Sequence, residues 1–359
     1  MIRAPLSFQP PEPNITTPTV PDDAPIHVPA ARRAAIEQLA AALQGVKRVA
    51  LSTHINADGD GCGSEAAMAR LLAQLGIGAY IVNPTPWPAM FEYLLGADVR
   101  NRSSEGPAAL SEAERILVLD ISDVKRLGAL AGAVRACKVP PLVIDHHLPG
   151  EEPPGTIHVT DVGACATGEL VYDFAVTLGL TLTPAIAMSL YTAIVTDTGG
   201  FRFSNTSPRC HAIASRLLAA GVDPDEMYRR IYASVPIGRM ALLRDALATL
   251  EVDQPHGLAW ISIAAGALEK YEVAGEDLDG IAEYPRSIAG MRMAVLFRDL
   301  GHGKVKLSIR SVGGVDSNAL ARVFGGGGHA RASGALVAGS LHEVRERVLA
   351  AARELIGTR

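Results

Sequence analysis

This 359-residue chain lacks features that several classes of protein require. Its four cysteines are scattered, without a CxxC pair, which argues against a structural zinc site and favours a reduced, cytoplasmic compartment. It has no run of about eighteen apolar residues, so no membrane span is expected. Its formal net charge is -5, whereas proteins that coat long duplex nucleic acid usually carry a strongly basic surface.

Aromatic residues are also scarce, at 5%, so aliphatic side chains must fill most of the core. The hydrophobic content of 48% is ordinary for a globular protein, and the length predicts two domains. Residues 1–30 are rich in proline and polar residues and have no apolar core. We expect a disordered or extended tail there rather than a signal peptide.

Short apolar segments alternate with helical patterns over residues 31–222. Strands that are apolar throughout are typical of a parallel sheet covered by helices on both faces. The pattern therefore predicts an α/β domain with a parallel sheet at 31–222. The expected strands are 46–53, 79–82, 116–119 and 142–144, and the expected helices are 31–43, 64–75, 168–178, 184–196 and 208–219.

The pattern changes in the last third of the chain. Residues 223–251 are helical and comparatively charged, with a break near Pro236, and predict a helical linker. A smaller α+β domain is expected at 252–359. Its expected strands are 258–263, 291–297 and 304–310, and its expected helices are 317–323 and 341–356.

Acids and imidazoles recur where the apolar segments of the first domain end. In α/β folds such positions meet outside the carboxyl ends of parallel strands. A single aspartate there is typically a helix cap or a turn residue, but the set of six favours oxygen and nitrogen ligands for a pair of divalent cations. An EF-hand is excluded because Ala67 stands where its loop needs a glutamate. The six residues are His54, Asp58, Asp60, Asp120, His146 and Asp197.

A second signal is the glycine run Gly325–Gly328, which His329 and then Ala332-Ser333-Gly334 follow. Successive glycines allow backbone N–H groups to approach an anion, although a flexible turn is the alternative. The run matches neither a Walker loop nor a dinucleotide-binding fingerprint.

Together, His54-x3-Asp58-x-Asp60, Asp120, the triplet Asp145-His146-His147 and Asp197 resemble the four motifs of the DHH phosphoesterase superfamily. The resemblance implies that His147 contacts the substrate phosphate and protonates the leaving group, and that Asp145 orients an imidazole. It implies one cation bound by His54, Asp58 and Asp120. It implies a second cation bound by Asp60, Asp120, His146 and Asp197, with Asp120 as the bridge.

The segment Lys304–Arg310, the glycine run and Ala332–Gly334 resemble the DHH-associated domain of the same superfamily. The resemblance implies that this domain binds the terminal nucleotide of the substrate, with the active site in the cleft between the two domains. Arg310 would also offset the charge that develops on the phosphate. The implied substrate contacts are Arg310, Gly326, Gly327, Gly328, His329 and Ser333.

The compact two-domain form is similar to the NrnA-like proteins of the superfamily. This implies a cytoplasmic oligoribonuclease (exonuclease) that hydrolyses short single-stranded RNA, or nanoRNA, to mononucleotides and dephosphorylates 3′-phosphoadenosine 5′-phosphate to AMP. It implies two Mn²⁺ ions, with Mg²⁺ or Co²⁺ as alternatives, and a monomer or homodimer without long-duplex or membrane partners. Two other functions stay open: a soluble phosphodiesterase for cyclic dinucleotides or linear dinucleotides such as pApA and pGpG, and a catalytically weak nucleotide-binding regulator.

Overall fold

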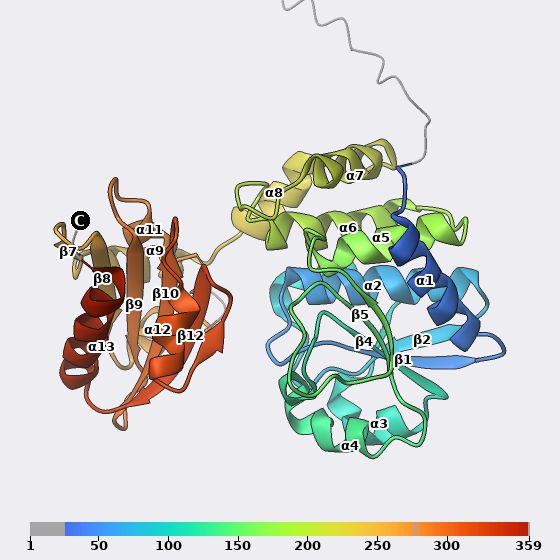
Figure 1. Ribbon diagram of the computed structural model, residues 1–359, viewed down its shortest axis with the longest axis horizontal. Coiled ribbons are helices and arrows are strands. Elements are labelled where there is room, and N and C mark those ends of the chain that lie inside the picture. The colour runs from blue at the N-terminus through green and yellow to red at the C-terminus, as the bar shows by residue number, and fades with distance from the viewer. Residues whose placement is uncertain (1–25, 276–277, 279, 358–359) are drawn as a thin grey trace, which may run out of the picture. The chain divides into compact units, whose positions relative to one another are not determined.

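The computed structural model describes residues 26–275, 278 and 280–357, and the chain divides into two compact units after Ile231 (Figure 1). Most of the predicted tail, residues 1–25, lies outside the described residues. Across the described ranges, no helix is both long and apolar enough to cross a membrane. The predicted fold class, a parallel-sheet α/β unit followed by a smaller α+β unit, is confirmed.

The first unit contains a six-stranded sheet in the order β3-β2-β1-β4-β5-β6, and every neighbouring pair is parallel. The sequence predicted four of the six strands; β3, with two residues, and β6, with only one buried residue, were missed. The strands are β1 (Arg48–Ser52), β2 (Gly78–Ile81), β3 (Arg100–Asn101), β4 (Arg115–Leu119), β5 (Leu142–Asp145) and β6 (Ile157–Thr160).

Helices cover both faces of this sheet, as Figure 1 shows with α2, α5 and α6 on one side and α3 and α4 on the other. Two buried hydrophobic clusters, one on each face, hold the layers together. One face carries α1 (Ala30–Ala42), α2 (Gly59–Gln74), α5 (Thr167–Thr177) and α6 (Pro184–Asp197). Helix α7 (Pro208–Ala219) packs on α5 and α6, and α8 (Pro224–Tyr232) follows it (Figure 1). The other carries α3 (Pro107–Ser111), the 3₁₀ turn η3 (Val124–Leu130) and α4 (Ala131–Arg135).

Helix α2 begins at Gly59, five residues earlier than the sequence predicted. The Asp58 side chain caps it by accepting hydrogen bonds from the backbone N–H groups of Asp60 and Gly61. Glycine disfavours a helix, which hid this start in the sequence. The glycines are needed because a Cβ atom at Gly59 would collide with Thr196 on α6, and one at Gly61 would meet the Thr53 side chain after β1.

The second unit contains a sheet in the order β11-β12-β10-β9-β8-β7, antiparallel except for the pair β8–β9. The sequence missed β7, β11 and β12, because these strands are short or built largely of small residues. Its strands are β7 (Glu251–Asp253), β8 (Leu258–Ile263), β9 (Met293–Asp299), β10 (Lys304–Ser311), β11 (Gly327–Gly328) and β12 (Ala332–Ala338). Its helices are α9 (Ile237–Leu247), α10 (Ala267–Tyr271), α11 (Glu283–Arg286), α12 (Ser317–Val323) and α13 (Leu341–Ile356).

Candidate active site

The predicted ligands of the first unit gather where the order of its sheet reverses. Strand β2 lies on one side of β1 and β4 on the other, so the loops after β1 and β4 leave the sheet side by side. His54 and Asp58 follow β1, and Asp120 follows β4. His146 follows β5, the next strand along, and Asp197 ends α6 on the face of the sheet that α2 covers.

His54, Asp58 and Asp120 form the first group. The Nε2 atom of His54 lies 3.5 Å from Oδ2 of Asp58 and 3.4 Å from Oδ2 of Asp120. This nitrogen is buried and has no hydrogen-bond partner within the described chain. A buried imidazole nitrogen that faces two carboxylates and bonds to neither has the donor set and the spacing of a cation ligand.

Asp60, His146 and Asp197 form the second group. The Nε2 atom of His146 lies 3.7 Å from Oδ2 of Asp60 and 3.7 Å from Oδ2 of Asp197. It also lies 3.6 Å from Oδ1 of Asp120, whereas Oδ2 of Asp120 faces His54. The two oxygens of Asp120 therefore face the two groups separately, as a bridging carboxylate requires.

Backbone carbonyls set the direction of both imidazoles. The Nδ1 atom of His54 contacts the carbonyl oxygen of Ile55 at 2.9 Å, and that of His146 contacts the carbonyl oxygen of Ala164 at 3.3 Å. When Nδ1 carries the proton and donates it to a carbonyl, the lone pair lies on Nε2 and points at the carboxylates.

Helix α5 braces two of the acids through a residue that the sequence did not indicate. The backbone N–H groups of Thr167 and Gly168 donate to the Asp60 carboxylate at 2.7 and 2.9 Å, and the Thr167 hydroxyl donates to Oδ1 of Asp120 at 3.0 Å. The N-terminus of a helix favours negative charge. Thr167 thus fixes Asp60 and Asp120 relative to each other; its only sequence signal is its place at the first position of a helix.

Asp120 adopts a backbone conformation that few residues tolerate. Its φ angle is +62°, in the left-handed region, and aspartate is among the residues that enter this region most readily. Its backbone N–H donates to the Ile144 carbonyl at 2.9 Å, which ties the turn to β5. The turn places a 2% exposed carboxylate between the two groups of ligands.

The close packing of charges shifts the pKa values of the site. Burial, together with the charge of Asp120, raises the pKa of Asp60 well above its usual value. Burial raises the pKa of Asp197 to about 7. Burial opposes the charged form of His54, but the carboxylates of Asp120 and Asp58 outweigh this and raise the pKa of His54 to about 10. Such mutual repulsion of carboxylates is the condition that a bound divalent cation relieves.

His147 lies beside the two groups but is held differently. Its Nδ1 atom is 2.7 Å from Oδ1 of Asp145 and is therefore engaged as a hydrogen-bond donor, although Oδ1 of Asp120 is only 3.6 Å away. Its Nε2 atom lies 3.5 Å from Nη1 of Arg126. Arg126 was not predicted from the sequence. It adds a positive charge beside an imidazole that can face a phosphate.

Asn205 is a second contact that the sequence did not indicate. Its Nδ2 atom donates to the Asp197 side chain at 3.2 Å and to the carbonyl oxygens of Asp197 and Cys165. It thereby fixes the carboxylate at the end of α6 against the segment that precedes α5.

The predicted substrate contacts of the second unit lie close together near one end of its sheet. Arg310 in β10 pairs with Ala332 in β12, and Ser333 pairs with Gly328 in β11. Arg310 donates to Glu283 at 2.9 Å, and His329 lies exposed in the turn between β11 and β12. The Ser333 hydroxyl is buried and unpaired among the described residues.

The glycine run is more ordered than a flexible turn. Gly327 and Gly328 form β11, and the Gly326 N–H donates to the Ala321 carbonyl at 2.9 Å. A Cβ atom at Gly326 or Gly328 would collide with β12, so close packing of two strands already requires these glycines.

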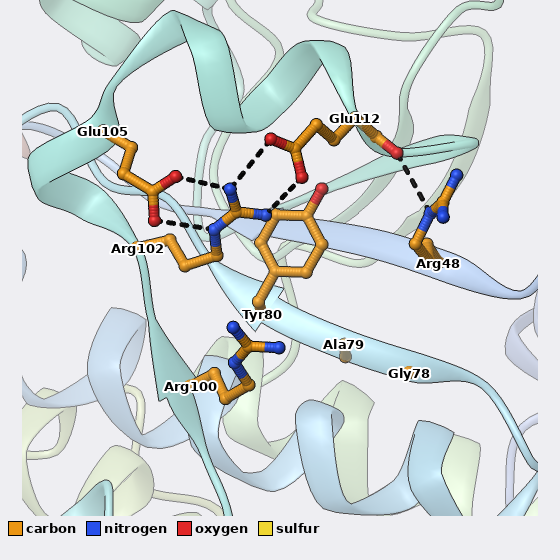
Figure 2. A pocket seen from close by; sticks show the side chains of 8 residues that line it. All are labelled: Arg48, Gly78, Ala79, Tyr80, Arg100, Arg102, Glu105 and Glu112. Carbon is orange, nitrogen blue, oxygen red and sulfur yellow. Dashed lines mark hydrogen bonds and ion pairs between the residues drawn. The ribbon is translucent and has the colours of Figure 1, made fainter.

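A separate cavity lies at the opposite edge of the first sheet, where the strands begin (Figure 2). Arg48, Arg100 and Arg102 line it beside the Tyr80 ring. Arg102 is already paired with Glu105 and Glu112, and none of the predicted site residues lies there. We therefore assign this arginine-lined cavity no role in the candidate active site.

Comparisons with known proteins identify the family of this chain. Residues 48–194 match the DHH family, N-terminal domain, and residues 261–358 match the DHHA1 domain. The chain is 34% identical over 308 residues to the bifunctional oligoribonuclease and PAP phosphatase NrnA of Thermus thermophilus, a match that covers 85% of this chain and 89% of that protein. It is 27% identical to the NrnA protein of Bacillus subtilis, over 80% of this chain and 89% of that one.

A solved structure agrees as well. The crystal structure of an exopolyphosphatase-related protein from Bacteroides fragilis has a TM-score of 0.83 and 27% identity to this chain. The match covers 90% of this chain and 98% of the Bacteroides fragilis chain. The similarity therefore extends over both units.

Proposed function

Because this chain belongs to the DHH family of metal-dependent phosphoesterases, we propose that it is a two-metal hydrolase of short oligoribonucleotides that also dephosphorylates 3′-phosphoadenosine 5′-phosphate. The observation that carries the proposal is the pair of ligand groups that share Asp120. The substrate classes are those that the names of the NrnA relatives state. Manganese is the metal we propose, because carboxylate and imidazole ligands suit it.

Two cations held by these groups would activate water and stabilise the charge of phosphoryl transfer. The ligands of these cations would be the residues of the two groups described above. His54, Asp58 and Asp120 would hold one ion, and Asp60, Asp120, His146 and Asp197 the other. Thr167 keeps Asp60 and Asp120 in place through its backbone N–H and hydroxyl groups.

His147 is proposed to hold a proton for the leaving oxygen. Asp145 fixes its ring through Nδ1. Because arginine only donates hydrogen bonds, Nε2 would carry this proton only when it faces the substrate instead of Nη1 of Arg126. Burial disfavours the charged imidazolium, but Asp145 and Asp120 outweigh this and raise the pKa of His147. A raised pKa keeps the ring protonated closer to neutral pH, as a general acid requires. Arg126 would offset charge on the scissile phosphate.

The second unit is proposed to bind the terminal nucleotide through Arg310, His329, Ser333 and the backbone of Gly326–Gly328. Arg310 offers a charge-assisted hydrogen bond to a phosphate if it exchanges Glu283 for substrate. The exposed imidazole of His329 lies in the adjoining turn.

Hydrolysis assays with Mn²⁺ on pApA, a five-nucleotide RNA and 3′-phosphoadenosine 5′-phosphate test the proposal. We expect turnover of all three, and a large loss of each activity in Asp120→Asn protein. A preference for cyclic dinucleotides over these substrates would favour the phosphodiesterase alternative. Tight nucleotide binding without turnover of any substrate would overturn the enzymatic proposal in favour of a regulator.

A further inference from the structure

A cavity of about 370 Å³ lies in the first unit beside the candidate active site. The chain between β5 and β6 forms one of its walls, and the ends of both strands contribute to it. Asp145 and His147 both line it, and Nδ1 of His147 lies 3.6 Å from the carboxylate of Asp120. The cavity therefore reaches the place where a scissile phosphate would be bound. Its size is in the range of pockets for small ligands.

Part of the cavity wall is apolar and rich in proline. Pro149, Pro153 and Pro154 line it from the loop, with Val143 of the sheet and the exposed Val162. Proline has a fixed backbone angle and a compact ring, so these walls lose little conformational entropy when a flat ring packs on them. Such a surface can pack against the face of a planar heterocycle, because the faces of unstacked bases are largely apolar and gain from leaving water.

The charges of the cavity exclude a phosphate group as its occupant. Asp145 and Asp161 line it, and no lysine or arginine does so among the residues that the structure describes. Asp161 is ion-paired with Arg32 at 2.6 Å, whereas the Asp145 carboxylate, among the residues that the structure describes, is paired with the imidazole of His147 alone. The cavity of Figure 2, with its three arginines, has the opposite character. A neutral group with N–H donors fits here, and an anion does not.

Asp145 lines the cavity with a carboxylate that is only partly paired. Its carboxylate is 1% exposed, and Oδ1 accepts from His147 while Oδ2 has no hydrogen-bond partner in the described chain. A buried carboxylate oxygen without a partner is costly, by roughly 1–3 kcal/mol or more. His158 lines the same cavity, with Nε2 engaged by the Gly155 carbonyl at 2.7 Å and Nδ1 left as a potential acceptor.

We infer that this cavity holds the second base of a dinucleotide substrate, the one not bound by the DHHA1 domain. The inference rests on the proposed function and deepens it. Its consequence is a split between the two proposed activities, because pApA has a second base and 3′-phosphoadenosine 5′-phosphate has none. Filling the cavity impairs the first substrate and spares the second.

The experiment fills the cavity from its exposed rim. Val162→Trp and Thr160→Phe each place a ring at a lining residue that is open to solvent, and Val139→Trp is the matched control at an exposed valine outside the cavity. We expect kcat/KM for pApA to fall about tenfold or more in both filled variants, as loss of one stacked base predicts, and to stay unchanged for 3′-phosphoadenosine 5′-phosphate. The control should match the parent protein on both substrates.

The outcomes separate this inference from the proposed function. If the parent protein hydrolyses both substrates and the filled variants lose neither or lose both equally, the inference is wrong and the proposed function stands. A crystal soaked with pApA gives a readout independent of turnover. Electron density for a base against Pro153 and Asp145 supports the inference, and an ordered water on Oδ2 of Asp145 with no base overturns it.

Discussion

The most buried candidate ligands of the first unit contrast with the two charged or ionisable candidate contacts of the second unit. In the first unit His54, Asp60 and Asp120 are at most 5% exposed, and helix α5, backbone carbonyls and close-packed glycines hold them. In the second unit His329 is exposed, and Arg310 is partly exposed and paired with Glu283. The difference supports the proposal that the first unit holds its ligands in a fixed geometry, whereas the second unit binds substrate through side chains that can change partners.

The largest loss of activity is expected from a substitution of Asp120. Asp120→Asn keeps the shape of the side chain but removes the charge that both ligand groups share, so kcat/KM should fall on the order of 10³-fold. Asp225→Asn, at an exposed acid on α8, is the control and should retain full activity. Circular dichroism should show both variants folded. A folded Asp120→Asn protein with activity within tenfold of the parent would contradict the proposal that both ligand groups depend on Asp120.

A smaller loss of activity is expected when the substitution affects a residue that supports the proposed ligands and leaves the ligands themselves unchanged. In Gly59→Ala the new methyl group meets Thr196, the neighbour of Asp197, and should displace the end of α6. We expect Mn²⁺ affinity and activity to fall roughly 10- to 100-fold, as for other residues that orient metal ligands. Gly132→Ala, at a helical glycine with open space around it, is the control. Equal behaviour of the two variants would show that the site is not rigidly held.

Substitutions in the second unit should weaken substrate binding and have little effect on the chemical step. Arg310→Gln removes one charged contact to a phosphate, so KM should rise about tenfold while kcat changes little. Arg322→Gln, at an exposed arginine on α12, is the matched control. A fall in kcat with constant KM would place Arg310 in the chemical step and remove the contrast between the units.

The mildest prediction concerns pH. The pKa of Asp197 is raised to about 7 and that of His54 to about 10, so both groups hold protons that a cation must displace. Apparent Mn²⁺ affinity should therefore fall as pH drops through 7, and binding should release protons. Calorimetry in buffers of different ionisation enthalpy measures that release. Binding without proton release would mean that these groups do not contact the ions.

The sequence indicated the proposed ligands more clearly than the residues that support them. Six acids and imidazoles at the ends of apolar segments predicted one site, because parallel strands deliver their ends to one edge. Thr167 could not be predicted in this way. Its bond to Asp60 joins residues 107 positions apart and depends on how α5 packs.

Several structural elements were not predicted from the sequence for a similar reason, because they depend on residues that are distant in the chain. The start of α2 was hidden by glycines whose reason lies in Thr196 and Thr53, far along the chain or outside the helix. Strand β12 was missed because Ala332–Ala338 is built largely of small residues, although Ser333, Ala335 and Val337 alternate toward the core. The cavity beside His147 depends on how the loop between β5 and β6 folds back on the sheet, which no local pattern specifies.

Anomalous scattering from crystals grown with Mn²⁺ tests the central claim most directly. The account predicts two peaks, roughly 3.5–4 Å apart. One should contact His54 and Asp58, the other should contact Asp60, His146 and Asp197, and Asp120 should contact both. A single peak, or two peaks without Asp120 between them, would contradict the account.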